Sequence, residues 1–331
     1  MKQIADIVGV SVTTVSRALN NPEMLKAETR WKILQAFEEQ GYIYNSVAGD
    51  LVRQKSTIIG VLLPNAKTPL FASALLGIQD CLQESGYSII AGNSKYDDEI
   101  ENKLLMQFHQ RQVAGIIRAG FGYNAAKFKQ WLKGYDIPCV ILLEKLENSE
   151  LSYVGFDNYQ ASLAMMNYLL SLRHRRIGLI IGPFSRTERV QKRFLGYRAA
   201  LAAAGLDFDP QIVIETETGL RDGADAFQKL MSRPDPPTAV FAAGDYMALG
   251  ALRAAHENGL KVPDDISIAG FGDIDVAAFS NPPLTTVRVP SYQCAYKGTE
   301  VLLKMIKEGG QTQHQYSLDT DLIIRSSCRE I

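Results

Sequence analysis

From Ile58 onward the chain alternates short apolar runs with longer amphipathic segments, and this alternation restricts the fold more than any other feature. The predicted strands cover residues 58–63, 87–91, 115–118, 138–143, 177–181, 212–215, 238–242 and 266–270, and a further one begins at Tyr153. The predicted helices cover residues 71–86, 99–112, 124–133, 159–172, 223–231 and 246–258, and another ends at Gly205. Strands that alternate with helices in this way predict an α/β fold with doubly wound parallel sheets.

A weak internal repeat divides this region into two lobes. The helix after the strand at 58 and the helix after the strand at 177 each contain a pair of glycines nine residues apart. We therefore expect two similar lobes, the first formed by about residues 58–155 and 286–318, the second by about 156–285 and 319–331. Because ligands bind beyond the carboxyl ends of parallel strands, the cleft between such lobes is the predicted ligand site.

Residues 4–20 have the pattern of a helix, a tight turn and a second helix, which is typical of DNA-binding helix-turn-helix units. Ala5 is small enough for two helices to approach, Gly9 suits a left-handed turn, and Ser11 is a good N-cap. The second helix of such a unit places its N-terminal residues against base edges. The residues that we expect to contact DNA there are Val12, Thr13 and Arg17. The alternative is an ordinary helical hairpin with no DNA role.

A third helix is predicted at residues 28–40, with Ile33, Leu34 and Phe37 on its apolar face. After it, Val47 and Leu51 lie four residues apart on a possible helix that is too short to be stable alone. We expect this segment to become ordered only on a partner.

These segments resemble the lactose-repressor (LacI/GalR) family. Ile4-Ala5, Gly9-Val10-Ser11, Thr14-Val15-Ser16-Arg17 and Asn20 resemble its DNA-binding headpiece, and the resemblance extends to the C-terminus. It implies a headpiece at residues 1–44, a hinge helix at 45–57 and a periplasmic-binding-protein-like effector and dimerisation domain at 58–331. Asn45, Ala48 and Leu51 match the hinge helix, and the family uses the residue at Leu51 as a wedge in the minor groove.

Loops that follow predicted strands supply the candidate effector-binding residues, which are Phe71, Arg118, Arg193, Asp245 and Asp273. The resemblance implies that Arg193 is the arginine that binds effector in many members. Asp245 opens a helix, where it either contacts the ligand or acts as the helix N-cap.

The charge balance of these candidates indicates an anionic effector. Sugar-binding members often have an aspartate at the position of Gly272, whereas this chain keeps Arg193 and adds Arg118. Two arginines without that aspartate favour a carboxylate or phosphate, such as gluconate or a ketogluconate. The alternative is that Arg118 pairs with an acid such as Glu144 and that the ligand is a neutral sugar.

The net charge of −1 provides no general attraction to nucleic acid, and residues 1–56 contain seven lysines and arginines against six acids. We therefore expect DNA affinity to come from specific contacts made by two headpieces together, with strong salt dependence. The expected partners are a second copy of the chain, double-stranded DNA with two-fold symmetry and a small effector.

Other classes of protein have little support in the sequence. Four scattered cysteines argue against a disulfide scaffold or a zinc site, and no signal peptide or long apolar run is present, so we expect a cytoplasmic protein without metal or cofactor. An enzyme would need an acid–base pair or a nucleophile, for which Asp245 and Asp273 are the only candidates. The sequence thus predicts an effector-controlled repressor of a carbohydrate or sugar-acid operon. The alternative is a cytoplasmic sugar-binding or sugar-converting protein whose first 56 residues only help folding.

Overall fold

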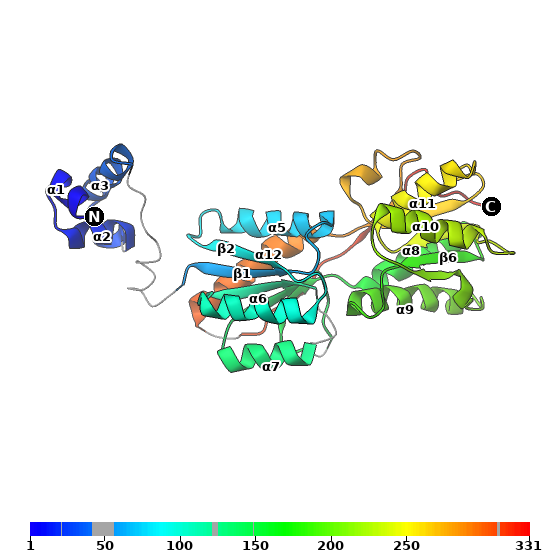
Figure 1. Ribbon diagram of the computed structural model, residues 1–331, viewed down its shortest axis with the longest axis horizontal. Helices are drawn as coiled ribbons and strands as arrows, with labels where there is room; N and C mark the ends of the chain where they lie inside the picture. The colour runs from blue at the N-terminus through cyan, green and yellow to red at the C-terminus, as the bar shows by residue number, and fades with distance from the viewer. Residues whose placement is uncertain (21, 42–55, 121–124, 148, 310–311) are drawn as a thin grey trace. The chain divides into compact units, whose positions relative to one another are not determined.

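The computed structural model describes residues 1–20, 22–41, 56–120, 125–147, 149–309 and 312–331 (Figure 1). Contacts within the chain divide it into two compact units, Met1–Thr57 and Ile58–Ile331. Each unit has its own buried core and is described by itself.

The first unit contains three helices, α1 (Lys2–Val8), α2 (Val12–Asn20) and α3 (Ala27–Glu39), and a short 3-10 turn at Pro22–Met24. Gly9 ends α1 at φ 75°, a left-handed conformation that glycine adopts without steric cost. The hydroxyl of Ser11 accepts a hydrogen bond from the backbone N–H of Thr14 at 3.1 Å, as expected of an N-cap. The predicted helix, turn and helix are therefore confirmed.

The core of this unit is made by small and branched side chains from all three helices. Its buried members are Ile4, Ala5, Val15, Ala18, Ile33, Ala36 and Phe37. The prediction that Leu34 belongs to the buried face of α3 is wrong, because Leu34 is 41% exposed. Ala36 takes that place, since it lies three residues from Ile33 and next to Phe37 on the same side of the helix.

The second unit contains two six-stranded sheets, each the centre of one lobe. The sheet of the first lobe has the order β11-β5-β4-β3-β1-β2, and all its pairs are parallel. Its strands are β1 (Ile58–Leu63), β2 (Ser88–Asn93), β3 (Gly115–Ala119), β4 (Cys139–Leu142), β5 (Ser152–Gly155) and β11 (Gln315–Ser317). Its helices are α5 (Pro69–Leu82), α6 (Asp98–Gln110), α7 (Ala125–Tyr135) and α12 (Ser291–Glu308), placed on both faces (Figure 1).

The sheet of the second lobe has the order β12-β10-β9-β8-β6-β7, in which only β12 is antiparallel to its neighbour. Its strands are β6 (Ile177–Ile181), β7 (Val213–Glu215), β8 (Ala239–Ala242), β9 (Ser267–Gly272), β10 (Thr285–Arg288) and β12 (Asp321–Ile323). Its helices are α8 (Asn158–Ser171), α9 (Glu188–Ala203), α10 (Leu220–Met231) and α11 (Asp245–Glu257). Short 3-10 turns lie at Pro210–Ile212 and Asp275–Ala277. The predicted α/β class with doubly wound parallel sheets is confirmed.

Several details differ from the sequence-based expectation, and four elements after residue 270, β10, α12, β11 and β12, were not predicted. The helix expected at 71–86 begins at Pro69, because proline is favoured in the first helical turn. Residues 286–288 were expected in the first lobe, but here they pair with β9 and β12, so the chain returns to the first lobe only after Arg288. Local pattern does not specify this pairing, since a short strand can join either sheet.

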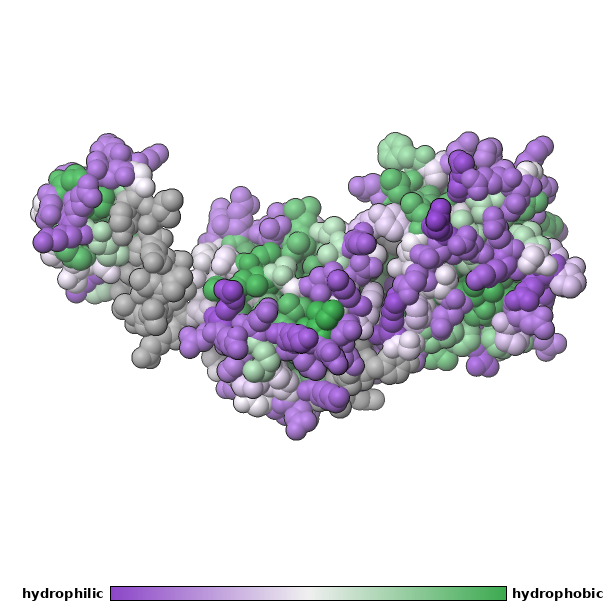
Figure 2. All heavy atoms as spheres, in the orientation of Figure 1, coloured by the Kyte–Doolittle hydropathy of each residue, from purple (hydrophilic) through white to green (hydrophobic). Residues whose placement is uncertain are grey.

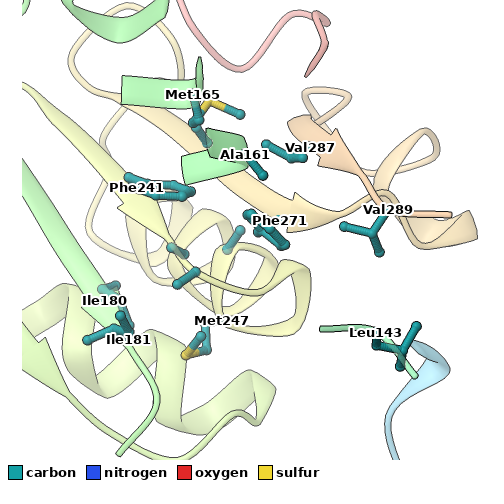
Figure 3. Close-up of a cluster of buried hydrophobic side chains, with 14 of the residues drawn as sticks. Leu143, Ala161, Met165, Ile180, Ile181, Phe241, Met247, Phe271, Val287 and Val289 are labelled. Atoms are coloured by element: carbon teal, nitrogen blue, oxygen red, sulfur yellow. The ribbon is translucent and has the colours of Figure 1, made fainter. Parts of the chain in front are cut away.

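One cluster of buried apolar side chains runs through both lobes. It joins Val61 and Leu142 of the first lobe to Ile180, Phe241 and Phe271 of the second. Figure 3 shows part of this cluster in the second lobe, with Leu143 of the first lobe at its edge. The two lobes are therefore one packed unit with a cleft between their strand ends.

The surface carries both polar and apolar areas. On the face shown in Figure 2, hydrophilic residues predominate over the second lobe, whereas apolar residues gather over the first lobe in the area of α5 and α6. Leu76 of α5 and Met106 of α6 are among the exposed apolar residues. None of the helices in the described ranges has the length and apolarity that are needed to cross a membrane.

Candidate functional site

A cavity of about 660 Å³ lies between the two lobes, beyond the carboxyl ends of their strands. The first lobe lines it with Phe71 of α5 and with Tyr96, which follows β2. The second lobe contributes two arginines of α9 and the loops that follow β8 and β9. This volume suits a small organic ligand.

Arg193 lies in the second turn of α9 and is buried. Its Nε donates to the side-chain oxygen of Asn158 at 2.9 Å, and its Nη1 donates to the carbonyl of Ala243 at 2.7 Å. The guanidinium lies over the ring of Phe271, 3.7 Å from its centroid. Burial, together with the like charge of Arg189, lowers the pKa of Arg193 to about 9, so it still carries its charge at neutral pH.

Arg189 lies one turn earlier on the same face of α9 and is 5% exposed. Its Nη2 donates to the hydroxyl of Tyr96 at 3.1 Å, and its guanidinium lies over the ring of Phe71, 5.1 Å from the centroid. Its Nη1 is buried without a hydrogen-bond partner among the described residues. Within those residues, neither Arg189 nor Arg193 forms a salt bridge with a carboxylate, since both are held by aromatic rings and neutral acceptors.

Two of the three carboxylates that line the cavity, Asp245 and Asp273, already accept hydrogen bonds from donors of the chain, and the third, Asp275, is exposed. Asp245 accepts from the hydroxyl of Thr286 at 2.6 Å and from the backbone N–H of Ile274 at 2.9 Å. Asp273 accepts from Arg325 and Arg288, both at 2.7 Å. Burial raises the pKa of Asp245 to about 6, although the hydrogen bond from Thr286 acts in the opposite direction. Asp245 does not cap α11, because Gly244 holds the N-cap position and Asp245 is the first residue of the helix.

Arg118 lies outside this cavity. It is buried behind β3, 2.8 Å from a carboxylate oxygen of Glu101 on α6 and over the ring of Phe128 on α7. It lines a separate cavity of about 90 Å³, to which Tyr96 also contributes. The prediction that Arg118 lines the effector cavity is therefore wrong, and the alternative that it pairs with an acid agrees with the structure, although that acid is Glu101 and not Glu144. The reason is that side chains alternate between the two faces of a strand, and this one points to the helices α6 and α7.

The DNA-contact candidates of α2 are all accessible. Val12 is 44% exposed, and Thr13 and Arg17 are exposed beside it on the surface of the helix. Asn45, Ala48 and Leu51 lie outside the described residues.

Sequence reasoning missed Arg189 and Tyr96. Arg189 carries a usable signal, because it lies four residues before Arg193 and such pairs share one face of a helix. Tyr96 carries none, since it reaches the cleft through a left-handed backbone at φ 60° that no local motif indicates.

Comparison with known proteins agrees with this architecture. A family model described as bacterial regulatory proteins, lacI family, matches residues 1–45, and one for a periplasmic binding protein-like domain matches residues 166–328. The transcriptional repressor CytR of Escherichia coli strain K12 is 34% identical over 338 residues, which cover the whole of this chain and 96% of CytR. This chain belongs to the LacI family.

Solved structures of the LacI family extend the comparison. The transcription regulator GntR from Chromobacterium violaceum is 33% identical, with a TM-score of 0.76 over 82% of this chain and 98% of that one. The lac repressor dimer bound to operator and an anti-inducer is 25% identical, with a TM-score of 0.86 over 98% of both chains. The chain is accordingly a ligand-responsive, DNA-binding transcription regulator, and the alternative of a sugar-converting enzyme is set aside, because CytR and the lac repressor are both repressors.

Proposed function

We propose that this LacI-family regulator is a cytoplasmic homodimeric repressor of a sugar-acid operon, and that its effector is a small anion bound in the cleft. The observation that carries the proposal is the pair of buried arginines, Arg189 and Arg193, which line the cleft and whose guanidinium groups form no salt bridge with a carboxylate in the described structure. A buried charge is costly unless it is compensated, so an anionic ligand would gain affinity there.

The state of the cleft carboxylates supports the same proposal. Neutral sugars are bound mainly through hydrogen bonds to their hydroxyls, for which carboxylates are strong acceptors. Here Asp245 and Asp273 already accept hydrogen bonds from Thr286, Arg325 and Arg288. Asp275 is exposed at the cavity, whereas Arg189 and Arg193 are its buried charged groups, and their donors suit a carboxylate or a phosphate.

The DNA side of the proposal rests on α2 and on the hinge. Val12, Thr13 and Arg17 would meet base edges in the major groove, and Leu51 would enter the minor groove of a symmetric operator. The relation to the operator-bound lac repressor dimer supports two copies on one site. The effector would act by binding the two lobe arrangements with different affinity, which for such systems amounts to about 1–3 kcal/mol of coupling.

The test compares ligands that differ in charge but share a carbon skeleton. Thermal unfolding of the full chain is measured with D-glucose, D-gluconate and D-glucose 6-phosphate. We expect an increase in melting temperature with gluconate or the phosphate and none with glucose, and we expect Arg193→Ala to abolish it while operator binding persists.

Arg198→Ala is the matched control, because Arg198 lies on α9 but packs over Phe208, 4.9 Å from its ring centroid. This variant should keep the full response. An increase with glucose alone would contradict the anionic effector and leave the regulator as a neutral-sugar sensor. Loss of both ligand and operator binding in Arg193→Ala would mean that Arg193 has a structural role.

A further inference from the structure

Glu144 connects the two lobes beside the arginine pair. It follows β4 in the first lobe and is 2% exposed. Its Oε1 accepts a hydrogen bond from the backbone N–H of Arg189, in the first turn of α9, at 3.1 Å. Its backbone lies directly against Gly155, where a side chain would have no room. Glu144 is therefore fixed on one side by the first lobe and holds α9 of the second lobe on the other.

The second oxygen of this carboxyl group, Oε2, is buried and has no hydrogen-bond partner among the described residues. The charged groups that act on Glu144 include Arg189, Glu188 and Arg193 of α9 and Arg118 of β3. Lys145, the next residue, is directed to Asp157 at 3.0 Å instead. A carboxylate in this position has only partial compensation for its lost hydration.

Burial accordingly raises the pKa of Glu144 to about 7, while Arg189 and Arg118 act in the opposite direction and Glu188 adds to the increase. The free protein near neutral pH is therefore a mixture of protonated and ionised Glu144. An anion at Arg189 and Arg193 would compete with the Glu144 carboxylate for the same positive charge.

We propose that Glu144 is a positioning residue of the cleft, which holds Arg189 through its backbone N–H and, where it is ionised in the free protein, takes up a proton from solvent when an anion binds. This inference rests on the proposed anionic effector. At most one proton is then taken up for each anion bound, which offsets one unit of the negative charge that the anion brings into the cleft. The hydrogen bond to Arg189 persists, because a protonated carboxyl group still has a carbonyl oxygen to accept it.

The proposal determines the direction of the pH dependence. Bound anion raises the pKa of Glu144 above its value of about 7 in the free protein. Below that pH Glu144 is protonated in both states and affinity is constant. Above it, binding must recruit a proton, so affinity falls by up to about tenfold per pH unit.

The experiment is calorimetric titration of the full chain at pH 6 and pH 8.5, with D-gluconate and, separately, with sulfate, neither of which titrates in this range. Repetition in buffers of different ionisation enthalpy counts the protons taken up. Glu144→Gln keeps an acceptor for the Arg189 N–H but no charge. We expect Glu144→Gln to bind the anion with the same affinity as the parent at pH 6 and about tenfold more tightly than the parent at pH 8.5. It should take up no proton on binding.

Two further variants separate the possible roles. Glu144→Ala removes the hydrogen bond as well and should weaken binding at both pH values. Glu147→Gln removes one negative charge from an exposed position three residues away and should behave as the parent. If Glu144→Gln weakens binding as much as Glu144→Ala, or keeps the proton uptake of the parent, the role of Glu144 is overturned while the anionic effector stands. If neither anion binds the parent at any pH, the proposed effector class fails, and this inference fails with it.

Discussion

At the level of single residues, the cleft holds its two buried arginines against aromatic rings. Arg189 lies over Phe71 of the opposite lobe, and Arg193 lies over Phe271 of its own lobe. Aromatic faces attract a cation without cancelling its charge, so the guanidinium groups remain able to attract an anion. A salt bridge to a carboxylate would have neutralised them.

Arg17 provides a prediction on the DNA side. It is exposed in the middle of α2, where the resemblance to the LacI family places a base or phosphate contact. Arg17→Ala should cost about 1–3 kcal/mol in binding to the specific operator if it contacts a base. The measurement is a fluorescence anisotropy titration with specific and with random DNA.

Arg30→Ala serves as the control for Arg17, because it removes the same charge from an exposed position on α3. It should weaken binding to both DNAs similarly. Equal losses on both DNAs for Arg17→Ala would assign that residue to a phosphate instead of a base.

His174 predicts a pH dependence of stability. It is fully buried in the second lobe, where its ring nitrogens bond the hydroxyls of Thr238 at 2.9 Å and Ser267 at 3.0 Å. Burial lowers the pKa of His174 below the ordinary histidine value of about 6.5. As the pH falls through about 6.5 the unfolded chain is protonated first, so the contribution of His174 to stability decreases, by at most about 1.4 kcal/mol per pH unit.

Denaturant unfolding of the parent and of His174→Gln between pH 5 and pH 8 measures this effect. The difference in unfolding free energy between the two should be largest at pH 8 and should shrink towards pH 5. Glu144 has the opposite influence on the unfolding free energy of the parent protein. Its raised pKa favours the folded state as the pH falls. The comparison with His174→Gln removes that contribution, and a constant difference across the range would contradict the prediction.

At the level of secondary-structure elements, α10 and α11 pack so closely that each requires a glycine at the crossing. A side-chain carbon on Gly250 of α11 would overlap the carbonyl of Leu220, and one on Gly223 of α10 would overlap the carbonyl of Met247. Backbone atoms cannot rotate away as side chains do, so the helices would have to separate. The two glycines thus define the distance between the helices.

Gly250→Ala should therefore lower the unfolding free energy by about 1–3 kcal/mol or more, through overpacking. Gly134→Ala is the matched control, since Gly134 lies exposed in helix α7 with nothing within 4 Å of an added carbon. It should raise stability by up to about 1 kcal/mol, because alanine is the better helix former. Chemical denaturation measures the unfolding free energy of both variants. If Gly250→Ala has the same unfolding free energy as the parent, the helices separate without cost.

At the level of the whole molecule, function depends on two units with separate cores. The first unit presents α2, and the second unit contains the cleft, so ligand and DNA are bound by different units. Since residues 1–56 carry almost balanced charges, one headpiece alone has little electrostatic attraction for DNA. Two headpieces on one operator would supply the missing affinity.

The corresponding prediction concerns stoichiometry. A symmetric operator should bind two copies of the chain at saturation, and scrambling one half-site should weaken binding by more than about a hundredfold, because several base contacts are lost together. Affinity should fall steeply as salt increases. Analytical ultracentrifugation with labelled DNA gives the stoichiometry, and a single copy on a saturated symmetric site would contradict the dimer.

Local patterns in the sequence determined the kinds of elements and their order as far as residue 270, whereas β10, α12, β11 and β12 were not predicted. Apolar runs such as residues 58–63 and 177–181 specify buried strands, and Gly9 and Ser11 specify the turn of the helix-turn-helix. These features depend on neighbours within a few residues, where spacing and side-chain type suffice. Arg193 was found through the resemblance of its surroundings to the LacI family.

Only the tertiary structure decided which side chains meet in the cleft. It directs Arg118 to Glu101 behind the sheet, brings Arg189 and Tyr96 from different lobes into contact, and engages Asp245 with Thr286 of β10. These contacts join residues that are far apart in sequence, and they depend on strand pairing and on the face to which each side chain points. The physical reason is that burial and charge compensation are properties of the packed molecule, which no local spacing encodes.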